Sequence, residues 1–141
     1  MRAVLDVNVL IAALLAPDGA PARLLLRWLA GDFELVISDK ALSELRRALS
    51  YPKVRSRVPN AEASAFLDLL EASATKAPDP EKPPRRSRDA GDDYLLALAA
   101  STSAVVVSGD RDVLALAGDL PVYSPAAFLE SLGRSAESGR G

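Results

Sequence analysis

Four acidic residues stand beside apolar segments that lie far apart along the sequence: Asp6, Glu44, Asp93 and Asp110. Asp6 directly follows a short apolar run, where a carboxylate loses its hydration and needs compensation. The chain has no cysteine and no histidine, which excludes disulfides, thiolate nucleophiles and the commonest zinc ligands. Any chemistry must therefore depend on carboxylates, hydroxyls, lysine, arginine, tyrosine or a metal ion.

Carboxylates gathered at one place repel one another unless a multivalent cation lies between them. Ligands that offer only oxygen select a hard ion such as Mg²⁺ or Mn²⁺ over zinc. Such an ion lowers the pKa of a bound water, and a pair of ions can hold both the attacking and the leaving oxygen of a phosphodiester. Four converging acids would therefore support hydrolysis of a phosphate ester without a histidine.

The elements that must position these acids follow from the apolar pattern. Short apolar runs predict strands at residues 2–5, 33–37, 104–107 and 122–123. Amphipathic segments predict helices at residues 8–15, 21–29, 38–50, 60–74, 92–101, 113–117 and 125–132. Apolar strands that alternate with helices indicate a three-layer α/β/α domain with a central, mainly parallel sheet, similar in type to the Rossmann fold.

Capping residues and helix breakers mark the predicted helix ends. Asn8 is the predicted N-cap of the first helix, and Ser38 with Asp39 offers capping oxygens to the third. Gly31 is placed to end the second helix. Residues 77–91 carry four prolines and no apolar pattern, which predicts a surface loop.

This arrangement brings the acids toward one edge of the sheet. Asp6 and Asp110 each follow a predicted strand, and Glu44 lies about two turns into the helix after the second strand. Asp93 begins the helix that leads to the next strand. Because ligands of parallel α/β sheets bind beyond the carboxyl ends of the strands, we expect the four carboxylates to converge there.

Most of these acids also have an explanation that needs no chemistry. Asp92 and Asp93 are favourable residues near the positive end of a helix dipole. Glu44 lies off the apolar stripe of its helix, where solvated acids are common. Asp110 and Asp112 could cap the short helix that follows them.

Four motifs, in this order and spacing, resemble those of the PIN-domain family, especially its bacterial VapC-like members described as toxins of toxin–antitoxin systems. The motifs are LDVNVLIAALL, Glu44 within ALSEL, DDYLLALAA and VVVSGDRDVL. The match runs from about residue 2 to about residue 130. The resemblance implies a metal-dependent endoribonuclease with an acidic pocket that cuts single-stranded or structured RNA.

The resemblance also implies roles for individual residues. Four acids would act in catalysis and bind one or two Mg²⁺ or Mn²⁺ ions: Asp6, Glu44, Asp93 and Asp110. Asn8 matches the asparagine of the D-x-N opening, where its amide could orient Asp6 or a water on the metal. Ser108 stands where the family often has Thr or Ser. Asp92 could share the role of Asp93 through a water, and Asp112 is a second candidate beside the fourth acid.

Cationic residues near the predicted pocket could hold an RNA phosphate backbone through contacts that are largely independent of sequence. The candidates are Arg46, Arg47, Arg86, Arg88 and Arg111. The alternative is that they are solubilising charges paired with neighbouring acids such as Glu81 and Asp89.

The length of 141 residues and the 49% hydrophobic composition predict one domain over residues 1–132, with residues 133–141 as a disordered tail. No leader and no membrane span is expected, so a cytoplasmic location is the default. The net charge of -2 does not by itself predict a nucleic-acid partner.

Two kinds of protein partner remain open. The resemblance implies a cognate antitoxin that could cover the pocket, and apolar patches on the first two helices could serve a homodimer or higher oligomer. The alternative to an enzyme is a PIN-like module that binds RNA or supports assembly without cleavage. The presence of Asp6, Glu44 and Asp93 argues against that alternative.

Overall fold

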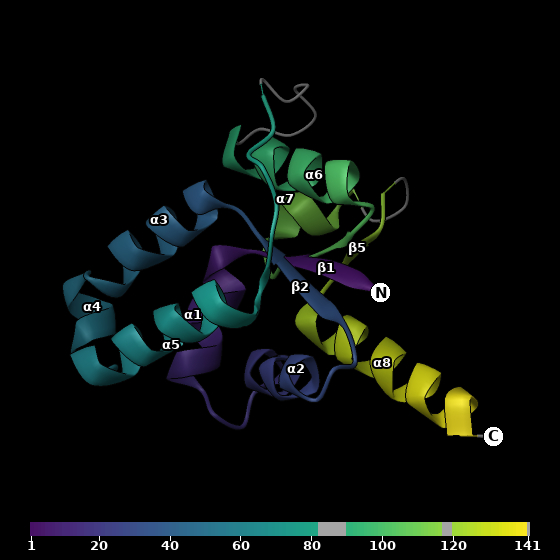
Figure 1. The fold of residues 1–141 in the computed structure, drawn as a ribbon, viewed down its shortest axis with the longest axis horizontal. Helices are drawn as coiled ribbons and strands as arrows, with labels where there is room; N and C mark the ends of the chain where they lie inside the picture. The colour runs from purple at the N-terminus through teal and green to yellow at the C-terminus, as the bar shows by residue number, and fades with distance from the viewer. Residues whose placement is uncertain (82–89, 117–119, 141) are drawn as a thin grey trace.

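The computed structural model describes residues 1–81, 90–116 and 120–140, which form a parallel sheet with helices on both faces (Figure 1). The described strands are β1 (Arg2–Leu5), β2 (Glu34–Ile37), β3 (Thr75–Lys76), β4 (Val105–Val107) and β5 (Val122–Tyr123). The helices in the same part of the chain are α1 (Val7–Leu15), α2 (Ala20–Leu29), α3 (Asp39–Leu49), α4 (Pro52–Arg55), α5 (Asn60–Ser73), α6 (Ala90–Thr102), α7 (Arg111–Leu114) and α8 (Pro125–Arg140).

The strand order places β1 at the centre of the sheet. The order is β3-β2-β1-β4-β5, and each neighbouring pair is parallel. Ala3 of β1 lies opposite Leu35 of β2 on one side and Val105 of β4 on the other. Successive strands are added first on one side of β1 and then on the other, so the direction of winding reverses between β1 and β4. Such a reversal is where open parallel sheets bind ligands, beyond the carboxyl ends of the strands.

Two apolar layers cover the sheet, because successive side chains of a strand point to opposite faces. Ala3 and Leu5 of β1 belong to a core shared with α1, α2, α3, α5 and α8. Val4 belongs to a second core on the other face, formed with α6 and α7. Figure 1 shows α6 and α7 on one side of the strands and α1, α2 and α8 on the other. The predicted three-layer α/β/α class is confirmed, and the described sheet is parallel throughout.

Several helix ends follow from local capping, with one correction. Asp6, not Asn8 as predicted, is the N-cap of α1, because its carboxylate is the group that accepts the N–H of Asn8. Ser38 caps α3 as predicted: its Oγ accepts the N–H of Ala41 at 3.2 Å. Gly31 follows the end of α2 with a φ of 87°, a conformation that favours glycine.

Two short elements and one helix end differ from the expectation. Neither α4 nor β3 was predicted, although α7 and β5, which are equally short, were expected at 113–117 and 122–123. Thr75 and Lys76 of β3 are polar and show no apolar run. The last helix was expected to end at Leu132 but continues to Arg140. Gly133 does not end α8, and no proline follows it before the C-terminus. The domain boundary at residue 132 stays a prediction.

None of the helices in the described ranges is long and apolar enough to cross a membrane alone. The stretch formed by α1 and α2 reaches that length and composition only as a pair bent by 100°. Buried helices of a protein core satisfy the same criterion.

Candidate active site

A pocket of about 190 Å³ lies beside the carboxyl ends of β1 and β2. Four acidic residues line it: Asp6, Glu44, Asp92 and Asp110. They come from the residue after β1, the middle of α3, the first turn of α6 and the residue before α7. Much of the remaining lining is apolar and belongs to β1, β2 and α6. The topology therefore brings together acids that are up to about a hundred residues apart in the chain.

Asp6 is held by hydrogen bonds to both of its carboxylate oxygens. Oδ1 accepts the backbone N–H of Asn8 at 3.3 Å, and Oδ2 accepts the hydroxyl of Ser108 at 2.9 Å. The N–H of Asp6 donates to the carbonyl of Val107 at 2.9 Å, which fixes the backbone to the end of β4. Asp6 is thus both a helix cap and a positioned carboxylate at the pocket. The exposed Asn8 also lines the pocket, but the contact that it makes with Asp6 is through its backbone.

Ser108 connects the first and the fourth acid. It is fully buried, and besides donating to Asp6 its Oγ accepts the N–H of Asp110 at 3.0 Å. Asp110 in turn accepts the N–H of Asp112 at 2.7 Å and caps α7. Asp110 therefore combines the capping role and the pocket position. Asp112 supplies that N–H and does not line the pocket.

Glu44 enters the pocket from α3, a helix with one strongly apolar face. Leu42, Leu45 and Leu49 are buried in the core, while Glu44 is half-buried. Its charge is close enough to Tyr94 to help raise the pKa of that phenol. The helix thus aims a carboxylate into the pocket because its leucines fix its rotation about the helix axis.

The two adjacent aspartates of α6 occupy different positions. Asp92 lines the pocket, whereas Asp93, which we predicted as the third acid, does not line it. Both are buried, and Oδ2 of each accepts no hydrogen bond from the described residues, although both residues take part in other interactions. Consecutive helical residues are rotated by about 100° from each other, so the two carboxylates leave α6 in different directions. Asp92 therefore lies at the pocket with the other three acids, and the role of Asp93 as the third acid stays a prediction.

Tyr94 forms a polar cluster at the pocket wall. Its hydroxyl is hydrogen-bonded to the hydroxyl of the fully buried Ser38 and to a carboxylate oxygen of Asp79. Burial, together with the hydrogen bond to Asp79, raises the pKa of Tyr94 to about 12, and the hydrogen bond from Tyr94 lowers the pKa of Asp79. The Lys40 ammonium lies 4.2 Å from the centre of the Tyr94 ring. Sequence reasoning missed this cluster, since its members lie in segments far apart in the chain and no local pattern links them.

The predicted cations are not all directed to the pocket. Arg46 forms an ion pair with Glu71 of α5 at 3.2 Å. Arg47, three residues after Glu44, is exposed and lies about 60° from it around the helix axis. Arg111 is exposed and directly follows Asp110. Two further predicted RNA contacts, Arg86 and Arg88, lie outside the described residues.

The donor set of the pocket fits a hard divalent cation in chemical type. Its acids and the Asn8 amide offer oxygen, and neither sulfur nor imidazole is present in the chain. As the side chains are placed, no three acidic residues in the described part of the chain are close enough together to hold a metal ion. Binding of an ion would therefore require the carboxylates to move toward one another.

A second hollow of about 310 Å³ adjoins the pocket and shares Asn8 and Asp110 with it. Its other lining residues are small or apolar and come from α1, α2, the turn before α7 and the start of α8. The acidic pocket therefore opens on a less polar neighbour, so that a ligand larger than an ion would meet both surfaces.

The sequence and the fold are similar to those of known proteins. Residues 2–112 match the family model described as PIN domain. The chain is 26% identical to the uncharacterized protein MJ1680 of Methanocaldococcus jannaschii, over 92% of this chain and 90% of that protein.

Similar folds occur in solved structures of two-protein complexes. VapBC2 from Rickettsia felis, bound to a DNA fragment from its promoter, matches with a TM-score of 0.61 and 15% identity over 88% of this chain and 98% of that chain. VapBC-1 from nontypeable Haemophilus influenzae matches with a TM-score of 0.59 and 17% identity, over 89% and 99%. FitAcB from Neisseria gonorrhoeae matches with a TM-score of 0.54 and 20% identity, over 88% and 98%. At these identities the similarity shows the fold.

Proposed function

The chain belongs to the PIN-domain family, whose members are generally nucleases, and we propose that it is a divalent-metal-dependent endoribonuclease that acts as the toxin of a toxin–antitoxin pair. The observation that carries the enzymatic part is the acidic pocket at the reversal of the sheet, lined by carboxylates from four separate elements. These carboxylates and the Asn8 amide offer a hard divalent cation oxygen ligands at one edge of the sheet, which is the support for a metal-binding site.

Asp6, Glu44, Asp92 and Asp110 are the residues that would hold one or two Mg²⁺ or Mn²⁺ ions, with Asp93 next to them. A bound ion supplies charge stabilisation to a phosphoryl oxygen and lowers the pKa of water.

The protein groups around these acids position and screen the site. Ser108 keeps Asp6 oriented toward the pocket by its hydrogen bond to Oδ2. Arg111, which directly follows Asp110, would offer positive charge to a phosphate next to the cleaved bond. Apolar side chains from β1, β2 and α6 line the pocket beside these acids.

Support for a protein partner comes from the similar folds. VapBC and FitAB are toxin–antitoxin complexes, and some of them are described with DNA. On this chain, Leu26 and Leu29 of α2 are 65% and 54% exposed, which is unusual for large apolar side chains that lie on the same face of a helix. We expect this face of α2 to be covered in the assembled protein, by a second copy or by the antitoxin.

Cleavage of RNA by the purified chain tests the proposal. We expect single-stranded RNA to be cut with Mg²⁺ or Mn²⁺ and to stay intact with a chelator. Asp6→Asn keeps a capping side chain for α1 but removes the charge, so it should lower the cleavage rate at least about a hundredfold. Asp68→Asn is the matched control, since Asp68 is an exposed acid on α5 that lines none of the pockets described here.

Two results would contradict the nuclease proposal. Cleavage that survives both the chelator and Asp6→Asn would show that the acidic pocket is not responsible. Binding of RNA without any cleavage under either ion would instead identify a PIN-like binding module.

A further inference from the structure

The segment from Arg46 to Arg57 concentrates positive charge at one end of the molecule. It contains five cations, and no acidic residue occurs between Glu44 and Glu62. The chain as a whole has 17 lysines and arginines and 19 acids, so this segment is positively charged although the net charge of the chain is negative. We call it the α3–α4 basic surface, and its cations are Arg46, Arg47, Lys53, Arg55 and Arg57.

Few of these cations are neutralised within the described structure. Arg46 is paired with Glu71, and Arg57 donates to the carbonyl of Leu15 at 3.2 Å. Arg47, Lys53 and Arg55 form no ion pair with any described residue. Surface charges that only keep a protein soluble are normally interspersed with acids, whereas here Glu71 is the one acid that forms an ion pair with these cations among the described residues. An excess of cations of this kind is typical of a surface that binds a polyanion.

A hollow of about 210 Å³ lies within this surface, between α3, α4 and α5. Arg46 and Arg55 line it together with three polar residues, Ser50, Asn60 and Ser64, and three apolar ones, Leu49, Ala63 and Leu67. Guanidinium, hydroxyl and amide groups are the donors that proteins use to hold phosphate oxygens. The polar groups of the hollow therefore suit the same kind of ligand, a polyanion, as the cations around it.

An exposed aromatic residue stands among the cations. Tyr51 is 53% exposed and is the residue before α4, between Arg47 and Lys53 in the sequence. A large aromatic ring that is more than half exposed, in a segment rich in cations, is available to a ligand. Proteins that bind single-stranded nucleic acids combine such rings, on which bases stack, with a cationic track for the backbone.

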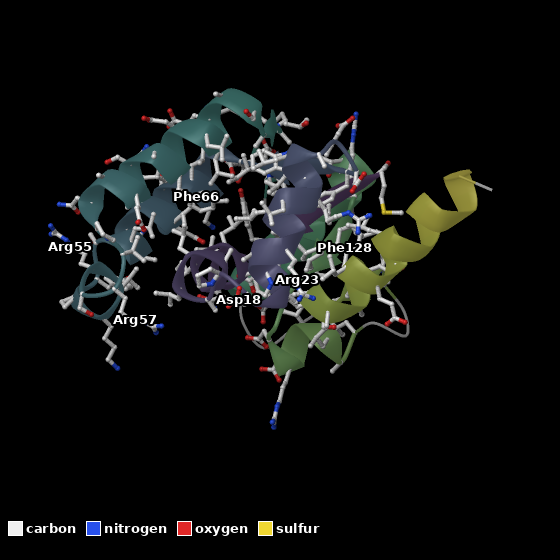
Figure 2. The ribbon with its side chains drawn as sticks, turned by 90° about the horizontal axis from the view of Figure 1, so that it is seen from below. Asp18, Arg23, Arg55, Arg57, Phe66 and Phe128 are labelled. Atoms are coloured by element: carbon white, nitrogen blue, oxygen red, sulfur yellow. The ribbon has the colours of Figure 1, made fainter. Side chains whose placement is uncertain are left out.

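The surface is continuous with the candidate active site along one helix. Glu44 lines the acidic pocket, and α3 carries the chain from there to Ser50 over about 9 Å along the helix axis. Figure 2 shows Arg55 and Arg57 at the end of the molecule opposite to α8. A strand that leaves the pocket in this direction would pass over α3 and reach α4.

We propose that the α3–α4 basic surface binds single-stranded RNA a few nucleotides away from the cleaved bond, with phosphates on Arg47, Lys53 and Arg55 and a base on Tyr51. This inference rests on the proposed function for the identity of the polyanion. It adds a second, remote contact that selects substrates long enough to reach α4 and open enough to present an unpaired base.

Equilibrium binding of a labelled single-stranded RNA of about twenty nucleotides tests this surface, followed by fluorescence anisotropy over a range of salt concentrations. The double substitution Lys53→Gln with Arg55→Gln should raise Kd about tenfold or more. It should also lower the slope of log Kd against log salt by about 1.4, because each phosphate contact on a single strand contributes about 0.7. Arg23→Gln is the matched control, since Arg23 is an exposed arginine on α2, outside this surface.

A separate variant tests the base contact. Tyr51→Ala should raise Kd for the single strand at least about fivefold and leave Kd for a fully paired duplex nearly unchanged, because a duplex offers no base to stack. Circular dichroism of each variant checks that the fold is retained.

Unchanged Kd and salt slope in the double variant, equal to those of the Arg23→Gln control, would overturn the proposal. All measurements use the Asp6→Asn background, so that RNA is not consumed. If the surface binds RNA as described but the wild-type chain never cleaves it, the nuclease proposal fails and this one stands. If the wild-type chain cleaves RNA and the double variant binds normally, only this one fails.

Discussion

Asp6 shows how one carboxylate serves both the fold and the site. Its two oxygens accept different hydrogen bonds, one from the start of α1 and one from Ser108 after β4. The cap stabilises the helix, and the Ser108 contact fixes the direction in which the remaining lone pairs of the carboxylate point. These two hydrogen bonds stabilise the carboxylate at the end of a buried strand. Because both donors are uncharged, the negative charge of the carboxylate stays available to a ligand.

Ser108 is predicted to act by positioning Asp6. Ser108→Ala removes the donor to Asp6 and leaves the Asp110 N–H without its acceptor. We expect kcat for RNA cleavage to fall about 10- to 100-fold and the free energy of unfolding to fall by about 1–2 kcal/mol. Ser108→Thr retains the hydroxyl and should recover most of the rate, as steady-state kinetics and urea unfolding would show. A wild-type rate in Ser108→Ala would exclude the positioning role.

The adjacent acids of α6 are predicted to differ in their effect on catalysis. Asp92 lines the pocket and Asp93 does not, so Asp92→Asn should reduce the cleavage rate more strongly than Asp93→Asn. Initial rates at saturating Mn²⁺, compared with unfolding free energies, separate loss of activity from loss of stability. If Asp93→Asn reduced the cleavage rate more strongly than Asp92→Asn, Asp93 would be the third acid, as predicted from the sequence.

The hydrogen bond between Tyr94 and Asp79 is predicted to make the free energy of unfolding depend on pH in the acid range. The folded protein lowers the pKa of Asp79, chiefly through the Tyr94 hydrogen bond, so this contact contributes stability above the ordinary pKa and loses it as pH falls through the lowered value. Tyr94→Phe should cost about 1 kcal/mol near neutral pH and make unfolding free energy less sensitive to pH below about 4. Urea unfolding at several pH values measures both. An unchanged pH slope in Tyr94→Phe would rule out the coupling.

At the scale of elements, α7 depends on a residue that also belongs to the site. Asp110 caps this four-residue helix and lines the pocket. Asp110→Asn should keep the cap and lose the charge, so we expect reduced cleavage with a nearly unchanged unfolding free energy. Asp110→Ala should lose both, with a further cost of about 1 kcal/mol. Kinetics and thermal unfolding of the pair test this, and equal stability of the two variants would show that the cap contributes nothing.

Elements with a strong local signal were predicted from the sequence, and elements without one were not. The apolar run of β1 and the leucine stripe of α3, with its Ser38 cap, follow directly from the residue pattern. Thr75–Lys76 joins the sheet as β3 because β2 offers it an open edge, and these two polar residues show no apolar run that would predict a strand. The choice of Asp6 over Asn8 as the cap depends on backbone geometry, since both residue types are good caps.

In the candidate site, too, some features could be predicted from the sequence and others depend on tertiary packing. Each acid could be assigned to the carboxyl edge of the sheet from its place after a strand or within a helix. Which of Asp92 and Asp93 faces the pocket depends on the rotation of α6, which is set by packing against the sheet. The cluster of Tyr94, Ser38 and Asp79 depends on tertiary contacts alone.

For the molecule as a whole, the order β3-β2-β1-β4-β5 is the feature on which the account depends. It places the ends of β1 and β4 side by side, so Asp6 and Ser108 meet although they are 102 residues apart. The helices on the two faces bring the other acids to the same edge. The site therefore exists only in the folded chain, and an ion that binds there should also stabilise the fold.

Isothermal titration calorimetry with Mn²⁺ tests directly whether acids from separate elements form one divalent-cation site. We expect uptake of one or two ions by the wild-type chain and by the Asp68→Asn control. It predicts that Asp6→Asn and Glu44→Gln each weaken this binding at least about tenfold. No uptake by the wild-type chain, or equal uptake by all four proteins, would contradict it.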